Sequence, residues 1–119
     1  LILNCTVTKE QFIDERSKAK FGSSVGDSNV FKINFGKKTV NSPIFNDEVR
    51  FFIYEEWLLE FKEWYELDNS TTDYEKITIN RYTGSYKRER MLGFHETDGV
   101  NWMVTTMNGT CEKATEQKF

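Results

Sequence analysis

Two cysteines stand near opposite ends of the chain, and this placement constrains the fold more than any other feature. Cys5 and Cys111 are too far apart in the 119 residues to form a CxxC redox motif or half of a zinc site. A disulfide between them would hold the two ends of the chain side by side. The alternative is two unbonded buried thiols in a reducing compartment.

The disulfide interpretation places the protein in an oxidising compartment, either the periplasm or the extracellular space. The chain begins at Leu1 rather than at methionine, which fits a mature product whose signal peptide has been removed. No apolar run approaches the roughly 20 residues that a membrane span needs, so the chain is not predicted to cross a membrane. Its hydrophobic content of 38% is enough for one core, and we predict a single exported domain over residues 1–119.

Short segments that alternate apolar and polar residues recur along the chain. Residues 31–35 and residues 75–80 both show a period of two, which is typical of strands that bury one face. The turns between such segments are short, and this favours antiparallel neighbours over βαβ units. We predict an all-β or β-rich α+β fold, an antiparallel meander that forms a small barrel or half-barrel. In such a fold a bond from Cys5 to Cys111 would join the first strand to the last.

Helical segments are expected only near the ends of the chain. Thr8 stands three residues before Gln11, the spacing of a capping box, so a short helix or an ordered loop is predicted from Thr8 to about Lys20. Residues 111–119 fit either one or two helical turns or a last strand.

Glycine and polar residues predict the loops and turns. Three loops or turns are expected, at residues 22–29, 93–99 and 108–110. Pro43 predicts that its strand is at an edge or interrupted, because proline cannot donate a ladder hydrogen bond. In the hairpin of residues 77–90, Gly84 is expected to take the positive φ of the turn, with Ile77 and Ile79 pointing into the core.

Residues 47–67 fit two periods at once. Their aromatic and leucine residues recur at helical spacing, and a partly overlapping set alternates as in a strand. Aromatic enrichment and the strands expected on both sides favour two strands broken near Glu55 and Glu56. A single helix is the alternative.

Acidic residues gather in the same part of the chain. Residues 47–75 carry ten acidic and two basic side chains, whereas the flanking segments are slightly basic. Aromatic side chains beside charge of one sign are typical anchors of protein interfaces. We therefore predict a surface that binds a basic protein partner, formed by Trp57, Glu60, Glu63, Trp64 and Glu66. The other interpretation is a solvated acidic surface beside core aromatics.

The hairpin of residues 77–90 combines four basic residues with two tyrosines, a mixture that can contact phosphates and stack on bases. A strand here would point Arg88 and Arg90 to one face and Lys87 to the other. The protein is also net acidic and lacks an RNP1 pattern. We predict an ordinary charged strand that discourages edge pairing, with no nucleic-acid binding, and expect removal of Arg88 or Arg90 to change folding little.

His95 is the only histidine of the chain. With Glu89 and Arg90 it forms the one set of side chains suited to general acid–base chemistry such as RNA cleavage, which makes a small secreted hydrolase or nuclease the enzymatic alternative. No metal site is predicted, because one histidine leaves no recognisable ligand spacing. No cofactor is expected either, since the sequence has no phosphate-binding glycine loop, nucleophile elbow or dinucleotide fingerprint.

The C-terminal third contains "ITINRYTGSY" at residues 77–86 and "MNGTCEKATEQKF" at residues 107–119. These stretches resemble small uncharacterised exported proteins of proteobacteria and their prophages, which combine an I-x-R-x-T-G hairpin with a terminal G-T-C…K-F. The resemblance implies an exported all-β domain with a disulfide. It implies no activity and no site residues.

Taken together, the sequence predicts a small exported, disulfide-linked binding protein that acts through protein contact, for instance an inhibitor, an immunity factor or an exclusion factor. Besides the hydrolase alternative, the nearest variant is a barrel that binds an apolar small molecule, since the chain has ten phenylalanines. The sequence names neither the partner nor the oligomeric state.

Overall fold

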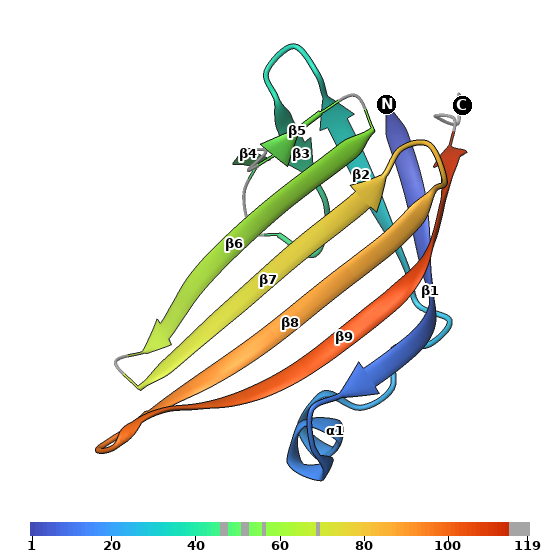
Figure 1. The fold of residues 1–119 in the computed structure, drawn as a ribbon. Coiled ribbons are helices and arrows are strands. Elements are labelled where there is room, and N and C mark those ends of the chain that lie inside the picture. The colour runs from blue at the N-terminus through green and yellow to red at the C-terminus, as the bar shows by residue number, and fades with distance from the viewer. Residues whose placement is uncertain (46–47, 51–52, 56, 69, 115–119) are drawn as a thin grey trace.

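The structure is a computed structural model that describes residues 1–45, 48–50, 53–55, 57–68 and 70–114. In this part of the chain nine strands form one antiparallel sheet, and a short helix follows the first strand (Figure 1). The elements are β1 (Ile2–Phe12), α1 (Glu15–Phe21), β2 (Ser28–Asn34), β3 (Thr39–Asn41), β4 (Val49–Arg50), β5 (Ile53–Tyr54), β6 (Leu58–Asp68), β7 (Thr71–Asn80), β8 (Ser85–Glu96) and β9 (Gly99–Ala114). The predicted β-rich fold with a short N-terminal helix is confirmed.

The sheet is an antiparallel meander that curves until it nearly closes into a barrel (Figure 1). Its strand order is β4-β3-β2-β1-β9-β8-β7-β6-β5, so β1 lies between β2 and β9. β4 also contacts β6, which brings the two ends of this order together. The predicted meander and barrel-like closure are therefore confirmed.

The first and last long strands meet directly. Cys5 lies opposite Cys111 in the ladder between β1 and β9, and the two cysteines form the predicted disulfide. Cys5 is buried among the apolar core residues. Because the bond closes almost the whole chain into one loop, it restricts the unfolded state strongly.

Half of the inner face of the sheet carries the hydrophobic core. The longer strands turn alternate residues toward it, as the period of two requires. The buried apolar side chains are Cys5, Val7, Phe31, Ile33, Val40, Phe45, Val49, Leu59, Phe61, Ile77, Ile79, Tyr86 and Met107. The ring of Phe31 lies 5.7 Å from that of Phe61 and 5.9 Å from that of Tyr86, measured between centroids. We call this region the apolar half of the inner face.

α1 begins later than the sequence predicted. Thr8 belongs to β1, which pairs with β9 almost to its end, and Asp14 is the residue that caps the helix. The Asp14 carboxylate accepts a hydrogen bond from the Ser17 amide at 2.7 Å. The predicted start at Thr8 is wrong, because strand pairing with a distant segment prevails over a local capping pattern.

Two glycines that predicted loops lie inside strands. Gly93 is in β8, where a Cβ atom would stand 2.7 Å from the Trp102 ring that lies over it. Gly109 is in β9, where a Cβ atom would stand 1.8 Å from the Thr6 carbonyl oxygen, beside a bulge in the β1–β9 ladder. The loop predicted at 93–99 is therefore shorter than expected, a turn at residues 97–98 between β8 and β9, and the turn predicted at 108–110 is wrong. Glycine serves close packing at both positions rather than a change of direction.

The hairpin between β7 and β8 turns as predicted. Gly84 has a φ of 73°, and its amide donates to the Asn80 carbonyl at 2.8 Å. Its own carbonyl accepts a hydrogen bond from the Cys111 amide at 2.7 Å, which ties the turn to β9. Ile77 and Ile79 enter the core, as expected.

The described part of residues 47–67 is strand rather than helix. Glu55 and Leu58 exchange backbone hydrogen bonds of 2.9 and 3.3 Å across a tight turn, at the predicted break between the strands. β3 ends before Pro43, also as expected. β9 extends to Ala114, which favours the strand alternative for the C-terminal segment. Glu56 and residues 115–119 lie outside the described residues.

Candidate functional site

The predicted binding residues are divided between the two faces of β6. Leu59 and Phe61 are in the core, so alternation points Glu63 inward and the side chains at Glu60 and Trp64 outward. Trp57 precedes the strand and is 43% exposed. The side chain of Glu66 lies outside the described part of the structure. Of the predicted set, β6 brings Glu60 and Trp64 together on one face.

Glu60 does not offer a free negative charge. Its carboxylate lies 3.6 Å from the amine of Lys76 and 3.7 Å from that of Lys62, and 11% of its side chain is exposed. The ammonium groups of the two lysines neutralise the charge of this carboxylate on the outer face of the sheet. A charge reversal at Glu60 would therefore disturb the sheet itself.

Trp64 is the exposed aromatic residue of this surface. Its side chain is 59% exposed, and its ring packs at a tilt of 42° against the buried Tyr74 of β7, with 4.2 Å between the ring centroids. This contact limits the motion of the indole, and more than half of the side chain remains accessible. A rigid, accessible indole is the type of residue that anchors protein interfaces.

β6 also has an open edge beside Trp64. β5 pairs with β6 at Leu59 and Glu60, and within the described residues the stretch from Glu63 to Asp68 pairs with β7 alone. Figure 1 shows this end of β6 at the border of the sheet. Backbone amides and carbonyls along such an edge can pair with another extended chain.

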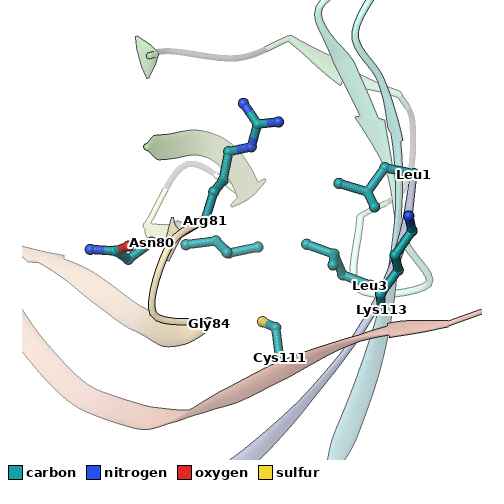
Figure 2. Close-up of a pocket in the computed structure, with 8 residues that line it drawn as sticks. Leu1, Leu3, Asn80, Arg81, Gly84, Cys111 and Lys113 are labelled. Carbon is teal, nitrogen blue, oxygen red and sulfur yellow. The ribbon is translucent and has the colours of Figure 1, made fainter. Parts of the chain in front are cut away.

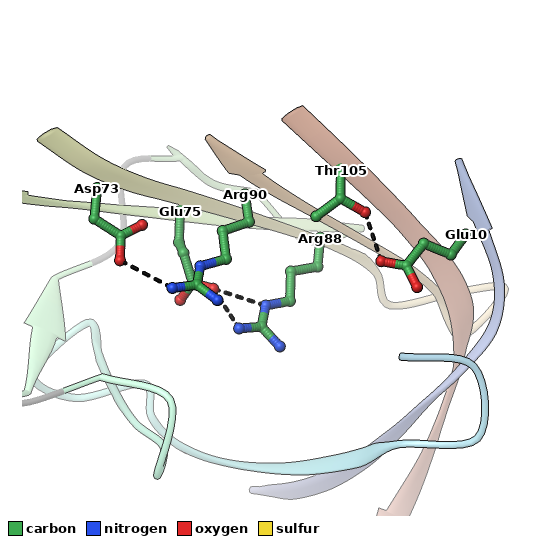
Figure 3. Close-up of polar contacts among 6 residues, drawn as sticks. All are labelled: Glu10, Asp73, Glu75, Arg88, Arg90 and Thr105. Carbon is green, nitrogen blue, oxygen red and sulfur yellow. Dashed lines mark hydrogen bonds and ion pairs between the residues drawn. The ribbon is translucent and has the colours of Figure 1, made fainter. Parts of the chain in front are cut away.

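The rest of the inner face is charged. Arg88 and Arg90 of β8 point inward beside Asp73 and Glu75 of β7 (Figure 3). Arg88 Nε donates to Glu75 Oε1 at 2.9 Å, and Arg90 Nη2 lies 3.2 Å from Asp73 Oδ2. The Arg90 guanidinium also stands 5.4 Å from the centre of the Phe21 ring of α1. We call this region the charged half of the inner face.

Glu10 connects the charged half to the loop after α1. Its carboxylate accepts a hydrogen bond from the buried Thr105 hydroxyl at 2.6 Å (Figure 3) and another from the Ser24 amide at 2.6 Å. The Ser17 hydroxyl of α1 accepts from the amide of Val104, also at β9. These bonds hold the helix and its following loop against the sheet.

Burial changes the titration of two groups on the inner face. Desolvation raises the pKa of Glu75, although Arg88 and Arg90 oppose the rise. Desolvation also raises the pKa of Tyr86 to about 12. The Tyr86 hydroxyl belongs to a residue that is 2% exposed, and within the described residues it lacks a hydrogen bond of good geometry, although Asn29 and Arg88 lie near it and act to lower the pKa. The arginines and carboxylates of the charged half thus neutralise one another, and together they form a structural network.

This network was not predicted from the sequence. The returning strand of the hairpin at residues 77–90 is a charged strand, as predicted, but β8 lies inside the sheet between β7 and β9, so the prediction that it discourages edge pairing is wrong. Lys87 pairs with Glu89 on the other face at 2.9 Å. The available signal was the alternation of β7: Asp73 and Glu75 share the inward face with Ile77, opposite the arginines. The absence of nucleic-acid binding stays a prediction.

The residues of the hydrolase alternative are not brought together. His95 and Glu89 share the outer face of β8, about 20 Å apart at the strand rise of ~3.3 Å per residue, and Arg90 faces inward. The His95 ring nitrogen Nε2 is 2.9 Å from the Thr72 hydroxyl. In the described part of the chain, no three His, Cys, Asp or Glu residues cluster as metal ligands.

Comparisons of the chain with protein-family models, with curated proteins and with solved structures found no match. The resemblance to exported proteobacterial and prophage proteins therefore stays a prediction from residues 77–86 and 107–119. The helix in the described residues, α1, is too short and too polar to cross a membrane.

Proposed function

We propose that this protein binds an extended, basic segment of a protein partner along the open edge of β6. The edge from Glu63 to Asp68, which pairs with β7 alone among the described strands, carries this proposal. A partner segment would add one strand to the sheet and gain backbone hydrogen bonds along it. Its alternate side chains would meet the two faces of β6 in turn.

Two side chains of β6 set the chemistry of the preferred partner. Trp64 is accessible on the outer face, where an arginine or lysine of the partner can lie over the indole. Glu63, on the inner face, makes no ion pair within the described residues, in contrast to Glu60 and Glu75. A basic side chain would neutralise Glu63, and the ten acidic residues of 47–75 favour fast, salt-sensitive association.

The disulfide is compatible with an oxidising compartment, and we place this activity in the periplasm or outside the cell. Capture of an exposed strand of a partner would suit an inhibitor, an immunity factor or an exclusion factor. Such a role needs no catalytic group.

The test uses short synthetic peptides and isothermal titration calorimetry at low salt. A peptide of alternating lysine and valine is expected to bind. A copy with methyl groups on alternate backbone nitrogens keeps the charge, but we expect it to bind at least about tenfold more weakly because it loses ladder hydrogen bonds. An alternating glutamate–valine peptide should not bind. Equal binding of the methylated peptide would overturn strand addition.

Substitutions locate the site. Glu63→Lys and Trp64→Ala are each expected to weaken binding of the lysine–valine peptide, whereas Glu112→Lys makes the same charge change at an exposed position of β9 and should leave it unchanged. Equal loss in the Glu112 variant would show that net charge, and not the β6 edge, is responsible.

A further inference from the structure

A pocket of about 260 Å³ opens at the end of the barrel near the disulfide (Figure 2). Its apolar wall is formed by Leu1, Leu3, Ile79 and Cys111, and two basic side chains, Arg81 and Lys113, stand at its border. The volume is close to the lower end of the range for small-molecule sites. The pocket lies at the Asn80 end of β7, away from the edge from Glu63 to Asp68, so the two sites are independent.

The pocket is a continuation of the core rather than a surface groove. Ile79 is 1% exposed and belongs to the core, and Leu3 and Cys111 pack against the core from the pocket side. Figure 2 shows the Cys111 sulfur and the Leu3 side chain directed into the space below Leu1. An apolar group placed here would lose contact with water on several sides, which favours its binding.

Gly84 keeps the β7–β8 turn close to β9 at this end. A Cβ atom at this position would lie 3.1 Å from the Cys111 carbonyl oxygen. The turn is therefore held against β9, and Arg81, which precedes it, is held at the border of the pocket.

No carboxylate of the described residues neutralises the two basic groups. Arg81 stacks its guanidinium 4.7 Å above the centre of the Phe35 ring, and its amide donates to the Trp57 carbonyl at 2.7 Å. Within the described residues neither Arg81 nor Lys113 forms an ion pair, in contrast to Arg88 on the inner face. Two uncompensated cations beside an apolar hollow favour a ligand with an anionic group and an apolar body.

We propose that this pocket binds a small amphipathic anion, a carboxylate attached to a short hydrocarbon chain. The hydrocarbon contacts Leu3, Ile79 and the disulfide, and the carboxylate accepts hydrogen bonds from Arg81 and Lys113. This is a second activity, separate from the strand addition proposed above.

The experiment compares three probes with the wild-type protein by NMR titration. Octanoate carries both recognised groups, 1-octanol lacks the charge, and acetate lacks the chain. Octanoate is expected to bind at least about tenfold more tightly than either control, with amide shifts centred on Leu3, Ile79 and Gly84. Equal binding of octanol and octanoate, no octanoate binding, or shifts centred elsewhere would each overturn the proposal.

Variants at exposed positions separate the site from general charge effects. Arg81→Gln with Lys113→Gln is expected to weaken octanoate binding by at least about tenfold. Lys20→Gln with Arg50→Gln removes the same kinds of charge from exposed positions of α1 and β4 and should bind as wild type. An equal loss in both double variants would overturn the role of Arg81 and Lys113. Glu63→Lys should keep octanoate binding, so failure of strand addition and failure of this site are distinguishable.

Discussion

In the apolar half of the inner face Phe31 packs against Phe61, whereas farther along the same sheet, in the charged half, Arg88 pairs with Glu75. Both halves follow the same alternation of inward and outward residues. They differ in what lies across from them, since β2 and β3 bring apolar residues such as Val40 over one half and α1 stands beside the other. Strand register therefore sets the face to which a side chain points, whereas the opposing element determines whether an apolar or a charged side chain suits that position.

Removal of the disulfide, which joins β1 to β9 in the apolar half, is expected to have the largest effect. Cys5→Ala with Cys111→Ala should lower the free energy of unfolding by about 4 to 5 kcal/mol, because the unfolded chain regains the freedom that a loop of nearly full length had lost. Equilibrium urea denaturation measures this change. Wild-type protein in a reductant is the matched control and should approach the variant, and a loss below about 1 kcal/mol would contradict the expectation.

Arg88→Ala tests the charged half. It should lower the free energy of unfolding by about 3 to 5 kcal/mol, because it leaves the carboxylate of Glu75 buried without its partner. This reverses the expectation from sequence that Arg88 matters little. Arg88→Met with Glu75→Leu should recover most of the loss, since apolar residues of similar size can replace a buried pair.

Phe61→Ala is the matched change in the apolar half. It should lower the free energy of unfolding by a similar amount, about 3 to 5 kcal/mol, because it leaves a cavity in the core. Equal instability of Arg88→Ala and the double variant Arg88→Met, Glu75→Leu would contradict the expectation that apolar side chains can replace the ion pair of the charged half. Urea denaturation of all the variants gives the comparison.

The pH dependence of stability should distinguish the halves as well. Because burial raises the pKa of Glu75 above 4.5, the ordinary value, the folded protein binds this proton more tightly than the unfolded chain does. The contribution of Glu75 is therefore fully present below pH 4.5 and is lost as the pH rises through its higher folded pKa. Relative to Glu75→Gln, the wild type should lose free energy of unfolding over this window, as measured by urea denaturation at a series of pH values. A difference that stays constant or grows would contradict the direction of the shift.

The smallest effect is expected at Tyr86, where the two halves meet. Tyr86→Phe should change the free energy of unfolding by less than about 1 kcal/mol, because the hydroxyl lacks a hydrogen bond of good geometry within the described residues. The ultraviolet absorbance of tyrosinate should show one group of the wild type with a pKa of about 12 that is missing from the variant. A large destabilisation would mean that the hydroxyl has a partner in solution.

The candidate protein site was predicted from sequence only in part. The acidic and aromatic composition of residues 47–75 predicted a binding surface in this region, but it treated Glu60 and Glu63 as equivalent. Pairing with β7 places Glu60 beside Lys76 and leaves Glu63 without an ion pair in the described part of the chain. Among the described residues β5 pairs with β6 at Leu59 and Glu60 and not beside Trp64, and no local pattern of residues specifies this register.

Features that depend on neighbours along the chain or on a simple period could be predicted from the sequence. These are the alternation that buries Ile77 and Ile79, the turn at Gly84 and the pairing of the two cysteines. Local conformational preferences and the period of a strand act over a few residues, and two cysteines leave one possible pairing.

Two features became clear only from the folded chain: which glycines end a strand and which lie inside one, and which charged side chains meet an oppositely charged partner. From sequence Gly93 predicts a loop, but in the structure it lies in β8 with the Trp102 ring over it. From sequence Arg88 is an ordinary surface charge, but in the structure it pairs with Glu75 of β7. The pocket between Arg81 and Lys113 likewise joins residues from a turn and from the last strand. The physical reason is that burial and ion pairing depend on what lies across the sheet, and this is set by the register of strands far apart in the sequence.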